Sequence, residues 1–227
     1  MPCKILCVVP SKPEDLKAET VRSVLDQTFP VEMLVLLPKK SKKQTTSDRV
    51  VEVLNDGLSR IRLEDFDYLL RLDGDTTLPS NFLEENLREC ADLCGKSGCA
   101  MLIKVSTFMR LMNGRFSVLS DDTYLGLKFL SGGATVKDWK IPARHRSVVH
   151  SGLTDYMFRG YLFYKVGYEP IHVVFQSLIH AKSFTLRDFA TVITYFFNVF
   201  RHTEKYDVAD FVRQHQISRL AKLKFKK

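Results

Sequence analysis

The first 72 residues alternate between short apolar runs and amphipathic stretches. The runs at 4–10, 32–38 and 68–72 are rich in Val, Ile and Leu and predict buried parallel strands. Between them, apolar residues at helical spacing predict helices over 14–27 and 49–58. Strands that alternate with helices predict an α/β sheet with right-handed crossovers and helices on its faces.

The later pattern predicts a helix over 81–93, a strand over 99–109 and a helix over 154–166, while 113–150 shows no clear period. Long irregular segments in compact domains often form the walls of binding sites. A helix predicted over 183–201 carries an apolar stripe. Its members are Phe189, Val192, Ile193, Phe196, Phe197 and Phe200.

We expect this stripe to pack on a core, as such stripes usually do. The basic tail at 219–227 follows the helix, and together they would also suit a peripheral membrane contact or a subunit contact such as a homodimer. At 227 residues the chain fits one domain with a C-terminal extension.

Composition restricts the setting. No run reaches the 18 to 20 apolar residues of a membrane span, and residues 1–4 lead directly into a strand without a signal-like segment, which predicts a cytoplasmic protein. Five cysteines without paired Cys-x-x-Cys spacing predict free thiols. The net charge of +8 favours anionic partners.

The run at 68–72 ends at Asp73-Gly74-Asp75, and Pro79 follows as the predicted start of a helix. Ligands bind at the carboxyl ends of strands in open α/β sheets, and paired carboxylates suit a hard divalent cation that carries phosphates. The alternative is an Asp-Gly turn with solvated side chains.

Several motifs occur in one order along the chain. They are Val-Val-Pro at 8–10, Ser-x-x-x-Gln-Thr-Phe-Pro at 23–30, Asp-Gly-Asp with Leu-Pro and Phe-Leu at 73–83, and Thr-Asp-x-x-x-Arg at 154–159 followed by Gly-Tyr and a distal His within 167–180. This order resembles the inverting glycosyltransferases of family 2, which have the GT-A fold.

The resemblance implies a GT-A type, Rossmann-like, mostly parallel sheet flanked by helices, with the glycosyltransferase domain at 1–182 and a C-terminal helical extension at 183–227. It implies transfer of a single sugar, with inversion, from a UDP- or GDP-sugar to a hydroxyl group, and Mn²⁺ or Mg²⁺ as cofactor. A glycan or lipid-linked acceptor fits the aromatic helix and basic tail.

The resemblance also assigns roles. Asp155 is the general base, and Asp73, Asp75 and His180 are metal ligands, with Asp73 also near the ribose.

Pro10, Ser11, Arg60 and Arg159 are expected to border the nucleotide or its diphosphate. The residues themselves leave other readings open. Asp155 lies where aspartates cap helices, Arg159 would be an ordinary solvated arginine, and a lone histidine such as His180 is most often structural.

The chain departs from the family pattern in three places. Leu-Pro-Lys-Lys at 37–40 stands where the family has Asp-Asp-Gly-Ser, so the base must be recognised differently. Thr154 replaces the Glu of a Glu-Asp pair, and the Gln-x-x-Arg-Trp signature of processive synthases is absent, which argues against polymer synthesis.

Two other functions remain as alternatives. A nucleotidyltransferase shares the architecture but would need a glycine-rich loop after the first strand, which 11–14 lacks. A catalytically silent binding module would explain the altered segment at 37–40. Nucleic acid is not an expected partner, because the lysines gather in one loop and the tail without interleaved aromatic residues.

Overall fold

The structure is a computed structural model that describes residues 3–38, 46–95, 99–117, 122–145, 152–179 and 186–224. The chain forms two compact units, Met1–Ser147 and Val148–Lys227. The domain boundary expected at 182 falls inside the second unit.

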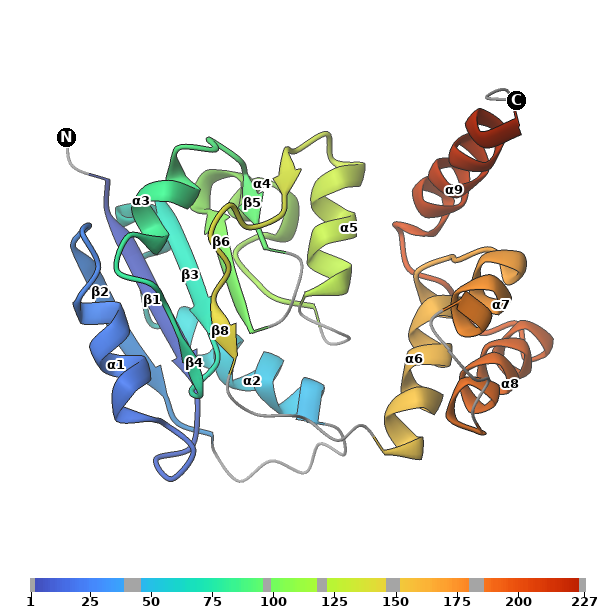
Figure 1. The fold of residues 1–227 in the computed structure, drawn as a ribbon, viewed down its shortest axis with the longest axis horizontal. Coiled ribbons are helices and arrows are strands. Elements are labelled where there is room, and N and C mark those ends of the chain that lie inside the picture. The colour runs from blue at the N-terminus through green and yellow to red at the C-terminus, as the bar shows by residue number, and fades with distance from the viewer. Residues whose placement is uncertain are drawn as a thin grey trace. The chain divides into compact units, whose positions relative to one another are not determined.

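A six-stranded sheet forms the centre of the first unit (Figure 1). In sheet order the strands are β2 (Val31–Leu36), β1 (Ile5–Pro10), β3 (Tyr68–Leu72), β6 (Ala100–Lys104), β5 (Leu93–Cys94) and β7 (Val136–Lys137). β1 is parallel to both β2 and β3, β6 is antiparallel to β3 and β5, and β7 is parallel to β5. The mostly parallel α/β sheet expected from the sequence is therefore confirmed.

Helices cover both faces of this sheet, because side chains alternate along its central strands. The helices are α1 (Ala18–Leu25), α2 (Thr46–Leu58), α3 (Phe82–Leu87), α4 (Val105–Met112) and α5 (Thr123–Ser131), and a 3₁₀ turn spans Leu63–Asp65. Leu6 and Val8 of β1 join one apolar cluster, with residues of α2, α4 and α5. Cys7 and Val9 join the other, with residues of α1 and α3.

Two predicted elements are wrong in part. The helix expected over 81–93 ends at Leu87, and Cys90 then has the left-handed φ of 48°, which turns the chain into β5. The strand expected over 99–109 ends at Lys104 and continues as α4. Val105 and Phe108 are both buried in the core at helical spacing, so packing decides the structure of a run whose composition suits a strand.

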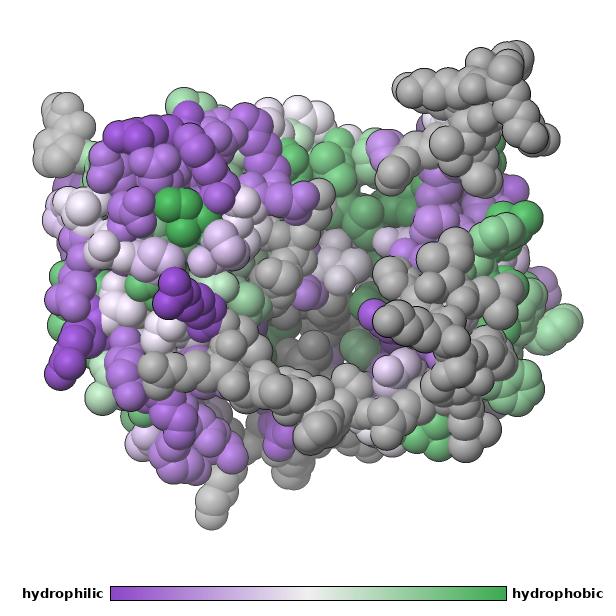
Figure 2. Space-filling view, viewed as in Figure 1, coloured by the Kyte–Doolittle hydropathy of each residue, from purple (hydrophilic) through white to green (hydrophobic). Residues whose placement is uncertain are grey.

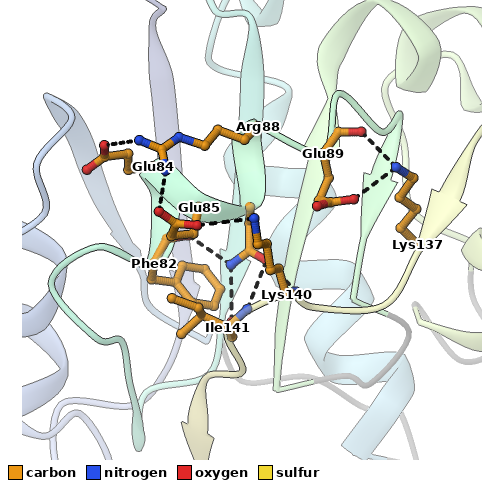
Figure 3. Close-up of polar contacts among 9 residues, drawn as sticks. Phe82, Glu84, Glu85, Arg88, Glu89, Lys137, Lys140 and Ile141 are labelled. Carbon is orange, nitrogen blue, oxygen red and sulfur yellow. Dashed lines mark hydrogen bonds and ion pairs between the residues drawn. The ribbon is translucent and has the colours of Figure 1, made fainter.

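The unassigned stretch 113–150 contains α5, β7 and the short β8 (Arg144–His145), which pairs with β4 (Thr76–Thr77). Figure 3 shows how α3 holds the chain before β8. Buried Asn86 accepts a hydrogen bond from the Lys140 amide (2.8 Å) and donates one to the Ile141 carbonyl (3.1 Å), and Lys140 pairs with Glu85 at 3.3 Å. α3, which follows the Asp-Gly-Asp turn, is thus tied to the chain just before β8 by side-chain contacts that periodicity does not predict.

The second unit is helical and consists of α6 (Leu153–Lys165), α7 (Pro170–Ile179), α8 (Leu186–Phe200) and α9 (Ala209–Lys224). α8 packs on α6 and α7. The helix predicted over 154–166 is confirmed as α6, and the basic tail begins within α9. α7 is a helix through Ile179, which directly precedes His180. Within the described ranges, none of the helices is long and apolar enough to cross a membrane.

Candidate functional site

The Asp73-Gly74-Asp75 segment forms a tight turn at the carboxyl end of β3. The Asp73 amide donates to the Cys99 carbonyl (2.9 Å), and the Thr76 amide donates to the Asp73 carbonyl (3.1 Å), which closes the turn around Gly74 and Asp75. The predicted turn at the end of the central strand is therefore present, with both carboxylates partly exposed.

The loop after β1 is packed directly against this turn. The Gly74 carbonyl accepts hydrogen bonds from the Lys17 amide (2.9 Å) and from the buried Thr20 hydroxyl (3.0 Å). A Cβ atom at Gly74 would lie 2.3 Å from Ser11 Oγ, so only glycine fits here without a shift. The structure thus brings Pro10, the last residue of β1, and Ser11 to the acidic turn. Their contact with a nucleotide stays a prediction.

The Ser-x-x-x-Gln motif at 23–30 holds the chain that follows the turn. Gln27 Nε2 donates to the Pro79 carbonyl at 2.7 Å, and its Oε1 accepts from the Leu83 amide at 3.0 Å. Ser23 Oγ accepts from the Leu78 amide at 3.1 Å. These hydrogen bonds give the motif a physical role, because they fix the segment between the turn and α3 to the end of α1.

A buried arginine lies behind the turn. Arg71 on β3 is 5% exposed, and its Nη1 lies 2.8 Å from Oδ1 of Asp73, whose side chain is 31% exposed. A buried guanidinium must be paired with an opposite charge. This contact therefore orients the Asp73 carboxylate and offsets part of the negative charge of that carboxylate. Sequence reasoning missed Arg71. The available signal was a single charge inside the apolar run at 68–72, two residues before Asp73 on the same face of the strand.

The turn fits a cation that arrives with a diphosphate. Within the described part of the chain, no group of three or more His, Cys, Asp or Glu side chains could hold a metal ion. Asp73 and Asp75 still supply carboxylate oxygens, which Mg²⁺ and Mn²⁺ prefer, and phosphate oxygens normally complete such sites. Because Arg71 engages one oxygen of Asp73, Asp75 is the better candidate for the main ligand.

Arg60 lies just beyond the end of α2. Its guanidinium pairs with Asp56 of the same helix at 2.8 Å and is largely exposed. Its expected contact with the nucleotide stays a prediction. Leu37 follows β2 and is exposed, whereas Lys39 and Lys40 lie outside the described residues.

The remaining candidates belong to the second unit. Oδ2 of Asp155 accepts a hydrogen bond from the Gly152 amide at 2.7 Å, so the capping role that the sequence left open is present at the start of α6. Arg159, one turn along, lies over the rings of Tyr156 and Phe163 at 6.0 and 5.9 Å. His180 lies outside the described residues. The catalytic role of Asp155 and the diphosphate role of Arg159 stay predictions.

Comparison with known proteins identifies the fold. No protein-family model and no curated protein matches the chain. Among solved structures, S. aureus TarS is 13% identical and aligns over 81% of this chain with a TM-score of 0.51, although the chain spans only 44% of that protein's length. The TarS fragment 1–349 is 11% identical, with 88% of this chain and 72% of the fragment covered and a TM-score of 0.50.

A mutant of Drosophila β-1,4-galactosyltransferase 7, crystallised with manganese, UDP-Gal and xylobiose, is 17% identical over 66% of this chain and 71% of its own, with a TM-score of 0.48. TarS and its fragment, with TM-scores of 0.51 and 0.50, are GT-A glycosyltransferases. The chain therefore has the GT-A glycosyltransferase fold.

Proposed function

We propose that the protein is an inverting glycosyltransferase that moves one sugar from a UDP- or GDP-sugar to a hydroxyl group of a glycan or lipid-linked acceptor. The observation that supports it best is the acidic turn at the carboxyl end of β3, packed against the loop after β1 in a GT-A fold. In open α/β sheets this edge is where nucleotides bind.

In this proposal Asp75, assisted by Asp73, would hold Mg²⁺ or Mn²⁺. The cation would supply Lewis-acid stabilisation of the leaving diphosphate. Arg71 keeps the Asp73 carboxylate in place from behind, at 2.8 Å. Pro10 and Ser11 border the nucleotide from the loop that touches the turn.

Asp155 receives the proton of the acceptor hydroxyl group. At the same time the hydroxyl oxygen of the acceptor attacks the anomeric carbon from the face opposite the diphosphate. Such proton transfer typically accelerates a reaction by a factor of about 10² to 10⁴. Arg159, one turn along α6, and His180 assist at the diphosphate or the metal. The nucleotide base is recognised without the acidic pair that usually follows the second strand, since Leu37 and Pro38 occupy those positions.

The first experiment measures release of UDP or GDP from a panel of sugar donors in the presence of Mn²⁺. Asp75→Ala is expected to lower turnover by about a hundredfold or more, since a metal contributes several kcal/mol to such a transition state. Asp65→Ala is the matched control, because Asp65 is an exposed acidic residue of the same unit that pairs only loosely with Arg62, at 3.6 Å. Equal turnover in Asp75→Ala and the native protein would refute the metal role.

The second experiment separates catalysis by Asp155 from capping. In Asp155→Asn the amide oxygen can still accept the Gly152 hydrogen bond, while the base is lost. We expect an unchanged thermal transition and turnover reduced by about a hundredfold. Asp210→Asn, an exposed acidic residue in the first turn of α9, is the control. Full turnover in Asp155→Asn would leave Asp155 with capping alone.

A further outcome distinguishes the enzyme from a silent module. Binding of UDP or GDP that depends on Mn²⁺, without turnover of any donor, would identify a nucleotide-binding module that kept the fold.

A further inference from the structure

α8 is amphipathic, but four of its large apolar side chains face outward. Its exposed apolar residues recur every three or four positions and so form one stripe along the helix. They are Phe189 (47% exposed), Ile193 (51%), Phe197 (52%) and Phe200 (78%). The expectation that this stripe packs on the protein core is wrong for these four residues. Phe196, at the edge of the stripe, packs against the small core of the second unit.

The inward face of α8 carries polar groups instead. Thr191, Tyr195 and Asn198 are at most 8% exposed. The helix approaches α6 so closely that a Cβ atom at Gly160 would lie 2.1 Å from the Thr191 carbonyl oxygen. There is thus little room for large apolar side chains at this crossing.

Each buried polar group on this face has a partner. Thr191 Oγ1 donates to the Tyr156 carbonyl (3.0 Å), and the Tyr195 hydroxyl donates to the Tyr168 carbonyl (2.6 Å). Asn198 Nδ2 donates to the Thr194 carbonyl (2.7 Å). The inward face of α8 is therefore held by polar contacts, while Ile193, Phe197 and Phe200 on the opposite side are each more than half exposed.

Hydrophobic residues also gather beyond α8. α7 exposes Ile171 and Phe175, one turn apart and each 56% exposed. Figure 2 shows hydrophobic residues along the right-hand edge of the second unit in this view. Exposed apolar residues that gather on one face of a protein often mark an interaction site.

The charge of the second unit indicates what kind of partner the exposed stripe contacts. Residues 148–227 contain 12 of the 34 Lys and Arg residues but only 6 of the 26 Asp and Glu residues, so they carry +6 of the net charge of +8. Arg201 lies directly beyond the stripe, with its guanidinium 4.4 Å from the centre of the Phe197 ring. An apolar stripe with Arg201 at its end, in a unit with a net charge of +6, is complementary to the surface of an anionic lipid bilayer.

We infer that the stripe formed by Phe189, Ile193, Phe197 and Phe200 docks on the surface of a membrane that contains anionic phospholipid. At 15 residues, α8 is too short to span the roughly 30 Å hydrocarbon layer, so it lies in the interface. The inference is independent of the proposed sugar transfer, since neither the turn nor Asp155 belongs to the stripe.

Sedimentation with vesicles tests this inference on the full chain. We expect binding to phosphatidylcholine vesicles with about a third phosphatidylglycerol, and binding about tenfold weaker to pure phosphatidylcholine or at high salt. Ile193→Ser/Phe197→Ser should weaken binding by about tenfold or more. The control Leu25→Ser/Leu130→Ser removes two exposed leucines of the first unit (66% and 37% exposed) and should bind like the native chain.

Circular dichroism must show that both double variants are folded. Arg201→Glu leaves the apolar stripe unchanged and should also weaken binding to anionic vesicles. If the native chain ignores anionic vesicles, or if Ile193→Ser/Phe197→Ser binds them as well as the native chain does, the inference is overturned. Absence of vesicle binding together with a native dimer that this variant splits in sedimentation velocity would overturn it in favour of a contact between two copies.

Discussion

The contact between Gly74 and Ser11 leads to a sharp prediction for the variant Gly74→Ala. The new Cβ atom would lie 2.3 Å from Ser11 Oγ and 2.7 Å from Ser11 Cβ. Ser11 is only 8% exposed, so its side chain cannot move into solvent without a shift of the loop. Overpacking of this kind costs about 1–3 kcal/mol, and the lower chain entropy of alanine in the unfolded state returns about 0.4–1 kcal/mol.

We therefore expect Gly74→Ala to lower the free energy of unfolding by about 1–2 kcal/mol. Gly74 does not have a positive φ, so the contact with Ser11 is the cause of the strain. Ser11→Gly removes both contacting atoms, and the double variant Ser11→Gly/Gly74→Ala should recover about 1 kcal/mol or more relative to additive single effects.

Urea unfolding followed by the fluorescence of Trp139 measures these values. Trp139 is the one tryptophan of the chain and lies in the first unit, with its ring centre 4.7 Å from that of Phe82, so it reports on the unit that contains the turn. Gly126→Ala in α5 is the control. Beyond its chain neighbours and the backbone of its own helix, nothing lies within 4 Å of its added Cβ, and alanine should stabilise the helix by up to about 1 kcal/mol.

The reasoning is refuted if Gly74→Ala is as stable as the native protein. It is also refuted if Ser11→Gly fails to relieve the loss, because the two positions would then not be coupled through the predicted contact.

Other predictions concern stability and thiol chemistry. Gln27→Ala should lower the free energy of unfolding by about 1–3 kcal/mol in the same urea assay, because it leaves the Pro79 carbonyl and the Leu83 amide without their partner; an unchanged midpoint would contradict the motif's holding role. Burial raises the pKa of the Cys94 thiol to about 11, above the value near 9 of the unfolded chain. The contribution of the Cys94 thiol to the free energy of unfolding should therefore be fully present below pH 9 and fall by about 1.4 kcal/mol per pH unit as pH rises toward 11. Urea unfolding at several pH values should show a shallower fall in Cys94→Ala. A thiol reagent at pH 8 should label exposed Cys90 quickly and buried Cys7, whose pKa burial also raises, only on unfolding; mass spectrometry identifies the labelled residue.

The sequence predicts the first half of the fold well, for physical reasons. The three strands β1, β2 and β3 are buried on both faces or beside such strands, so they are continuous apolar runs bounded by proline or aspartate. α4 could not be predicted, because the composition of the run after Lys104 suits a strand as well as a helix. The run becomes helical through the packing of Val105 and Phe108 in the core.

The second unit shows a different limit. Periodicity correctly predicts α6 and α8 and an apolar stripe on α8, but it cannot say whether that stripe meets protein or the outside. The close crossing at Gly160 and the buried Tyr195 decide this, and both depend on contacts between segments far apart in sequence.

At the candidate site, the turn and its two aspartates could be predicted because a strand end, a glycine and paired carboxylates are local signals. The buried pair of Arg71 with Asp73 and the fit of Ser11 against Gly74 could not be predicted, since they depend on side-chain directions and on the distance between two loops. The catalytic role of Asp155 rests on a motif and stays a prediction. Its hydrogen bond to Gly152 shows that the same carboxylate also has a local structural role.

Isothermal titration of the native protein and Asp75→Ala with UDP and with GDP, each with and without Mn²⁺, tests the central claim most directly. We expect one nucleotide to bind the native protein in the presence of Mn²⁺, and its affinity to fall by about tenfold or more when Mn²⁺ is removed or Asp75 is replaced. If neither nucleotide binds, or if Asp75→Ala binds as tightly as the native protein, the acidic turn is not a nucleotide-diphosphate site.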